Sequence, residues 1–203
     1  MKRKDSTLSC RAFCDEEVAN VVIPLHTMTG CDSNSGFYGH GKKPVYDKVS
    51  GDSEARDLLM RCGENLDIPE DVMCDMKSFV LKYVYGDKKS SSPGEARVFK
   101  WKSQKKKSFI GLPPDHDSLE IHCIRANYLA YIQRHFDMTH HPSPLGHGWQ
   151  LVDGRCRPVR YTQPSLPSEL SNTVDDDSNS DNTSDESDVD SDSDSEASSS
   201  DSE

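Results

Sequence analysis

The 203-residue chain has a formal net charge of −11 and a hydrophobic fraction of 33%, and the charge is spread unevenly along it. No stretch approaches the roughly 20 apolar residues of a membrane-spanning helix, and no apolar segment follows the basic N-terminus as it would in a secretory signal. We therefore expect a protein of the nucleus or cytosol, with no membrane partner.

The negative charge is concentrated near the C-terminal end. Residues 175–203 contain thirteen acidic residues and eleven serines but no lysine or arginine, so the 24 basic residues before them face only 22 acids. Such a polar segment cannot bury enough surface to offset the entropy of ordering. The predicted organisation is a flexible N-terminus over 1–18, one domain with a C-terminal extension over 19–167, and a disordered Ser/Asp-rich acidic tail over 168–203.

The first elements of the domain are read from their apolar patterns. Residues 18–28, VANVVIPLHTM, are apolar and β-branched, and they predict a buried strand that runs into a loop. Residues 42–49 and 53–63 predict two short helices. Residues 68–86 have apolar side chains at helical spacing and predict a longer helix.

The second half of the domain contains one further strong pattern. Residues 87–96, DKKSSSPGEA, predict a loop, and the basic segment 98–109 leaves its structure open. Residues 117–136 carry a broad apolar stripe and predict a second long helix. Residues 149–161 predict a small β-hairpin around an Asp-Gly pair. The predicted fold class is therefore mostly α with a few short strands.

Three motifs follow one another along this domain. They are TGCDSNSGFYGHGKK at 29–43, LPPDHDSLEIHCIRANYLAYI at 112–132 and PSPLGHGWQLVDGRCRPVRYTQPSLP at 142–167. In this order they are similar to a group of uncharacterised, mobile-element-derived animal proteins with an ALTGCDTTSAFFGKGK-like signature. The first motif also resembles part of the flap endonuclease-type 5′ nucleases of the PIN-like superfamily.

The nuclease resemblance implies a partial PIN/flap-nuclease-like α/β domain, with a helical hairpin region, C-terminal helices and a small β-hairpin. In those nucleases the aspartate of the Gly-Cys-Asp motif belongs to a carboxylate cluster that holds divalent metal, so the resemblance implies an Mg²⁺-binding role for Asp32. The hairpin backbone of those enzymes binds duplex phosphates. The matching phosphate-binding residues here are Gly39, Gly41, Lys42 and Lys43. His40 and Pro44 depart from the family pattern.

One aspartate does not make a catalytic metal site, because cleavage needs several converging carboxylates. Only 31 residues precede Asp32, and that is too little chain for the sheet that presents the other acids in the nuclease family. We therefore interpret the chain as a nuclease-like remnant with an incomplete metal site, not catalytic alone. The alternative is a truncated Mg²⁺-dependent 5′ nuclease that needs a missing upstream half, so the enzyme question stays open.

A second basic feature surrounds Trp101. Lysines neutralise backbone phosphates and an indole can stack on an unpaired base, so this segment is a candidate for nucleic-acid contact. The alternative is a solvated loop of the nuclear-import type. The candidate contact residues are Lys100, Trp101, Lys102, Lys105, Lys106 and Lys107.

The tail has its own functional pattern. Seven serine and threonine residues of 175–203 have an acid three positions on, which acid-directed kinases prefer, and each phosphate adds close to two negative charges. These candidate phosphorylation sites are Ser178, Thr183, Ser187, Ser191, Ser193, Ser198 and Ser200. Such a tail predicts competition with nucleic acid for the basic part of the chain, or an adaptor that binds DNA-associated basic proteins such as histones. The alternative is a solubilising spacer.

Overall fold

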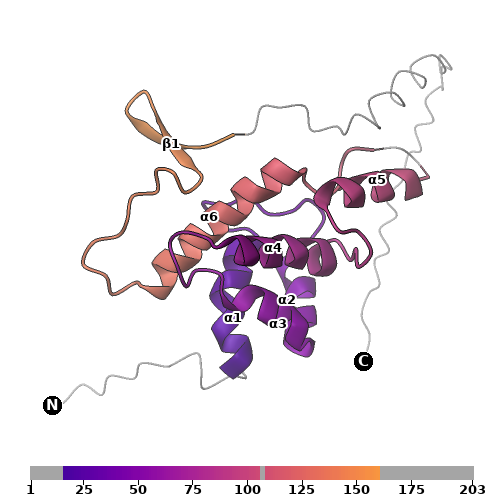
Figure 1. Cartoon of the computed structure of the whole chain (residues 1–203), viewed down its shortest axis with the longest axis horizontal. Coiled ribbons are helices and arrows are strands. Elements are labelled where there is room, and N and C mark those ends of the chain that lie inside the picture. Colours follow the sequence, from indigo (N-terminus) through magenta and orange to yellow (C-terminus); the bar gives the residue numbers. More distant parts are fainter. Residues whose placement is uncertain (1–15, 106–107, 161–203) are drawn as a thin grey trace, which may run out of the picture.

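The computed structural model describes residues 16–105 and 108–160, and the structural statements below concern these residues. The protein is mostly helical there, with one small two-stranded sheet (Figure 1). The predicted acidic tail and all of the predicted flexible N-terminus except residues 16–18 lie outside the described residues. Within the described ranges, no helix combines the length and the apolar character needed to cross a membrane.

The helical elements are α1 (Glu16–Met28), α2 (Lys42–Gly51), α3 (Ser53–Met60), α4 (Glu70–Phe79), the π-helix η2 (Val80–Val84), α5 (Pro93–Ser103) and α6 (His116–Arg134). They are followed by the strands β1 (Trp149–Val152) and β2 (Arg155–Pro158). The main hydrophobic core lies among α1, α2, α3, α4, η2 and α6. α5 and the β-hairpin lie at opposite sides of this helical body (Figure 1).

The first element is a helix, so the prediction of a strand over 18–28 is wrong. Its apolar side chains recur at helical spacing, and the buried ones include Val18, Val21, Leu25 and Met28. Pro24 lies inside α1 and cannot donate a hydrogen bond to the carbonyl of Asn20. Arg134 of α6 donates to that carbonyl instead, with an Nη2–O distance of 3.3 Å. Packing on α3 and α6 therefore outweighs the local preference for a strand.

The other predicted helices are confirmed, with shifted ends. The segment 42–49 lies in α2, and the segment 53–63 contains α3 followed by a turn. The segment 68–86 is α4 continued by η2, after which Tyr85 begins the next loop. The segment 117–136 corresponds to α6.

α5 begins inside the segment predicted as a loop. Ser92 caps this helix, because its hydroxyl accepts a hydrogen bond from the backbone N–H of Glu95 at 3.2 Å. Pro93 follows at the first helical position, where a missing N–H costs nothing. α5 continues through Ser103 and so gives a helical structure to the first half of the basic segment 98–109.

The β-hairpin is confirmed around its Asp-Gly pair, with β1 and β2 antiparallel and Val152 opposite Arg155. Both turn residues have positive φ, as the tight type I′ turn requires. Arg125 of α6 holds the hairpin: its guanidinium donates to the carbonyls of Gly148, at 3.0 Å, and of Val159. A Cβ on Gly148 would lie 2.4 Å from the Arg125 side chain, so only glycine allows this close approach.

Candidate nucleic-acid interface

The loop from α1 to α2 is held tightly at its base. Gly30 has φ +106°, and a Cβ there would lie 2.5 Å from the Cα of Gly36, so the two backbones are in contact. Cys31 and Asn34 exchange backbone hydrogen bonds of 2.8 and 3.2 Å across a tight turn. The buried Asn34 side chain also donates to the carbonyls of Thr27 and His122, at 3.1 and 3.3 Å. These contacts fix the loop on α1 and α6.

Asp32, the predicted metal ligand, lies exposed in the Cys31–Asn34 turn. Across residues 16–105 and 108–160, no group of three or more His, Cys, Asp or Glu side chains is arranged to hold a metal ion. Glu17 lies in the first turn of α1, where its carboxylate forms an ion pair with the guanidinium of Arg56 of α3, with an Nη2–Oε2 distance of 2.8 Å. The described residues therefore place Asp32 at the surface without assembling a carboxylate cluster for Mg²⁺.

The predicted phosphate-binding turn spans Phe37 to His40. The backbone N–H of His40 donates to the carbonyl of Phe37 at 3.0 Å, and Gly39 has φ +76°, as the third position of a type II turn requires. Gly41 follows in an extended conformation and caps the N-terminus of α2. The structure thus brings the predicted glycines and the first turn of α2 onto one exposed surface.

Tyr85 joins this turn to α5. The ring of Phe37 packs on its edge with centroids 5.7 Å apart, and the ring of His40 lies 4.5 Å from it. The ammonium group of Lys100, from α5, lies 5.2 Å from the centroid of the same Tyr85 ring. The glycine turn and the basic segment are far apart in sequence, and Tyr85 brings them together.

Two lysines, Lys48 and Lys100, lie close enough to His40 to affect its pKa. Partial burial lowers the pKa of His40, and the nearby ammonium groups of Lys100 and Lys48 lower it further. Lys48 is held in place by a hydrogen bond from its ammonium group to the carbonyl of Tyr83 at 2.8 Å. The two ammonium groups near His40 would attract an anion.

Lys42 and Lys43 lie on the first turn of α2. The Lys42 ammonium lies 3.0 Å from Nδ1 of His26 on α1. Lys43 pairs with Asp47 at 2.9 Å, with side chains 83% and 56% exposed, so this surface pair contributes little and yields readily to a phosphate. Beside them is a hollow of about 340 Å³. Its lining residues are Val22, Leu25, His26, Thr29, Lys42, Lys43 and Tyr46.

The second predicted basic feature is divided by the structure. Trp101 is 7% exposed and stacks on Phe109 at 4.6 Å, so its indole packs inside the protein and the expectation that it stacks on a base is corrected. Lys102 and Lys105 are exposed. Lys106 and Lys107 lie outside the described residues, as do the seven candidate phosphorylation sites.

Sequence reasoning missed four residues of this surface. They are Tyr38, Lys48 and Tyr85, together with His40, which had only been noted as a departure from a pattern. The aromatic Tyr38 inside a glycine-rich turn was a usable signal. Tyr85 and Lys48 gave none, because their role comes from tertiary packing.

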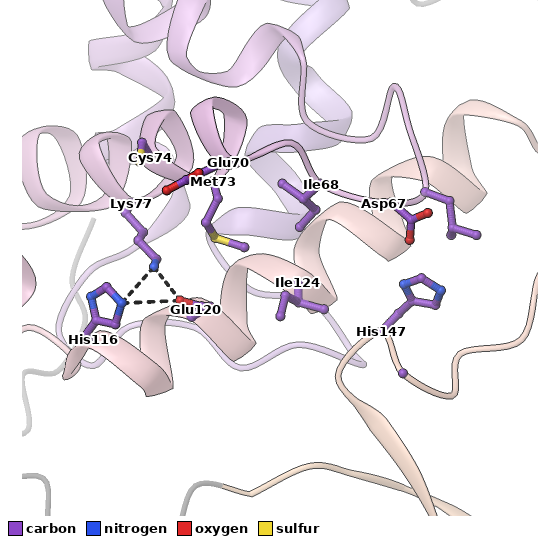
Figure 2. Close-up of a pocket in the computed structure, with 12 residues that line it drawn as sticks. Asp67, Ile68, Glu70, Met73, Cys74, Lys77, His116, Glu120, Ile124 and His147 are labelled. Atoms are coloured by element: carbon purple, nitrogen blue, oxygen red, sulfur yellow. Dashed lines mark hydrogen bonds and ion pairs between the residues drawn. The ribbon is translucent and has the colours of Figure 1, made fainter.

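A second hollow, of about 600 Å³, lies between α4 and α6 (Figure 2). At one end the ammonium of Lys77 donates to Glu120 at 2.7 Å and lies 3.3 Å from Nε2 of His116. Its lining contains three carboxylates, those of Asp67, Glu70 and Glu120. These outnumber the single lysine of the lining, so the hollow does not suit a phosphate backbone.

Comparisons of the chain with protein-family models, curated proteins and solved structures give no match. The resemblances to mobile-element-derived proteins and to flap-type nucleases therefore stay hypotheses carried by the motifs.

Proposed function

We propose that the chain binds the phosphate backbone of a nucleic acid through a basic surface made of Lys42, Lys43, Lys48 and Lys100, beside which His40 lies as a neutral side chain. One observation carries the proposal: His40 from the turn and Lys100 from α5 lie on the same Tyr85 ring. Lysine clusters bind nucleic acids by neutralising phosphates and releasing their counterions. The turn is already ordered by Gly30 and Asn34, so binding does not have to fold it.

In this proposal the chain is a nuclear or cytosolic, mobile-element-derived remnant of a flap-nuclease-like domain. It retains a phosphate-binding hairpin beside an incomplete metal site. The support for this ancestry is the order of the three sequence motifs. The support for the binding role is independent of it, because it comes from the positions of the lysines.

The binding role is tested by measuring DNA affinity over a series of salt concentrations. We expect the double substitution Lys42→Ala/Lys43→Ala to weaken binding and to lower the slope of log affinity against log salt by about 1–2, since each phosphate contact contributes about 0.9. The matched control is Arg155→Ala/Arg157→Ala, which removes the same charge from exposed positions of β2. Equal losses in both variants would show unspecific attraction and contradict the proposal.

The same samples test cleavage. Flap and duplex DNA are incubated with Mg²⁺ or Mn²⁺ and either the wild type or Asp32→Ala. If the chain is a remnant with an incomplete metal site, we expect no metal-dependent cleavage of either DNA by the chain alone. Cleavage by the wild type that is lost in Asp32→Ala would replace the remnant with an active nuclease.

A further inference from the structure

Tyr38 projects from the turn with 74% of its surface exposed. Its neighbours Phe37 and His40 both pack inward on Tyr85, so they hold the turn from both sides. Gly39 adds no side chain, and a Cβ at that position would meet no atom within 4 Å, so open space lies beside the turn. An aromatic ring on an ordered backbone has only two side-chain torsions to fix, which keeps the entropic cost of a stacking contact small.

A second exposed aromatic side chain follows the lysines on α2. α2 places Tyr46 one helical turn after Lys42 and Lys43, and its side chain is 39% exposed. It lines the hollow of about 340 Å³ together with Val22 of α1 and both lysines. The hollow thus has mainly apolar walls, to which the side chains of both lysines contribute, and this suits a nucleoside whose phosphate lies on the ammonium groups.

We infer that the basic surface binds an unpaired nucleic-acid strand, with one base stacked on Tyr38 and a neighbouring nucleoside in the hollow beside Tyr46. This inference rests on the proposed function, because Lys42 and Lys43 hold phosphates of the same strand. Two exposed aromatics, one before and one after a lysine pair in the sequence, match the combination of stacking platforms and positive charge used by single-strand-binding proteins.

The exposed aromatics distinguish an unpaired strand from a duplex. Stacking requires an open base face, and inside a duplex each face is covered by the next base pair. Single strands, overhangs and strand ends present open faces. Lysines alone would bind any of these substrates, so the aromatic side chains carry the discrimination.

The test uses fluorescence anisotropy with a single-stranded DNA of about 12 nucleotides, a blunt duplex of the same sequence, and that duplex with a single-stranded overhang. We expect Tyr38→Ala to lower the affinity for the single strand and the overhang about 5- to 150-fold, the range that corresponds to loss of one base–aromatic stack. Tyr38→Phe keeps the ring and is the matched control, with affinity close to the wild type. Tyr46→Ala should also lower the affinity for the single strand and for the overhang.

A probe with 2-aminopurine in the strand reports stacking directly. Its fluorescence should be quenched by the wild type and by Tyr38→Phe, and less by Tyr38→Ala. If Tyr38→Ala binds the single strand as the wild type does, or loses as much affinity for the blunt duplex, the inference is overturned while phosphate binding stands. If the wild type binds none of the three probes at low salt, the proposed function itself fails.

Discussion

At the scale of single residues, Gly30 has a structural role that could not be predicted from the Gly-Cys-Asp motif. Its φ is +106°, and a Cβ added at Gly30 would lie only 2.5 Å from the Cα of Gly36. There is therefore no room for a side chain. We expect Gly30→Ala to lower the free energy of unfolding by about 2–4 kcal/mol, from backbone strain and the clash together. Equilibrium unfolding in urea measures this loss.

Gly39 provides the matched control for that substitution. It also has a positive φ, of +76°, but a Cβ there would meet nothing within 4 Å. Gly39→Ala should therefore cost only the strain of the left-handed backbone, about 1–2 kcal/mol. If the two variants are equally destabilised, the contact between Gly30 and Gly36 is not what closes the loop.

Single residues also show which parts of the site were predictable. Lys42 and Lys43 could be found because the glycine turn and the helix that follows it are local features of the sequence. Trp101 was misjudged, because the sequence shows an aromatic among lysines but not that Phe109 folds back onto its ring. Tyr85 could not have been assigned at all, since its importance depends on segments that meet only in the folded chain.

At the scale of elements, His122 couples α6 to the end of α1. Its Nε2 lies 2.8 Å from the carbonyl of Met28, so Nε2 carries the proton and donates it. The pKa of His122 is lowered to about 4, mainly by burial and to a smaller extent by the charge of Arg125, while the hydrogen bond to Met28 opposes the shift. The neutral imidazole is therefore part of the junction between the two helices.

This junction makes the protein less stable in acid. Between pH 6.5, the ordinary pKa, and pH 4, the unfolded chain binds a proton at His122 that the folded chain does not. Stability should thus be full above pH 6.5 and fall as the pH drops towards 4, by a total on the order of 3 kcal/mol. Urea unfolding at a series of pH values between 7 and 4 measures the decline.

His122→Gln is the control for this pH dependence, because it keeps a side-chain N–H without a group that titrates. Carboxylates with lowered pKa values, such as those of Asp52 and Asp71, act in both proteins and cancel in the difference. The wild-type curve should be steeper than that of the variant. Parallel curves would mean that His122 is not buried as a neutral donor.

Comparison of the helices shows which secondary structure can be predicted from the local sequence pattern and which cannot. α4 and α6 were predicted because their apolar side chains recur at helical spacing along a long segment. α1 was misassigned because its β-branched residues resemble a buried strand. The helix is decided by burial against α3 and α6 and by the Arg134 hydrogen bond to Asn20, and both depend on residues distant in sequence.

At the scale of the whole molecule, the second motif contacts both the first and the third. Asn34 of the first motif donates to the carbonyl of His122 in the second, and Arg125 of the second donates to Gly148 and Val159 in the third. Much of the motif pattern therefore holds the fold together. The exposed residues of the turn take no part in these contacts, and the proposed binding role relies on them.

The largest charge contrast in the molecule lies between its basic surface and the tail. The thirteen acids of residues 175–203 are linked to a remaining chain with 24 basic and 22 acidic residues. A tethered polyanion would compete with nucleic acid for the lysines of the proposed surface. We expect deletion of residues 168–203 to strengthen DNA binding several-fold at low salt, with the difference shrinking as salt screens the charges. Phosphorylation of the intact tail should weaken binding further.

A full-length variant with every acid of residues 168–203 changed to Asn or Gln separates charge from bulk. If charge is the cause, this variant binds DNA as tightly as the deletion does, because both leave the lysines without a competing anion. Anisotropy titrations of the three proteins on one DNA probe make the comparison. If all three proteins bind the DNA probe with equal affinity, the tail does not compete with DNA. Binding to purified histones is measured on the same three proteins. Loss of histone binding in both altered proteins would instead make the tail an adaptor for basic partners.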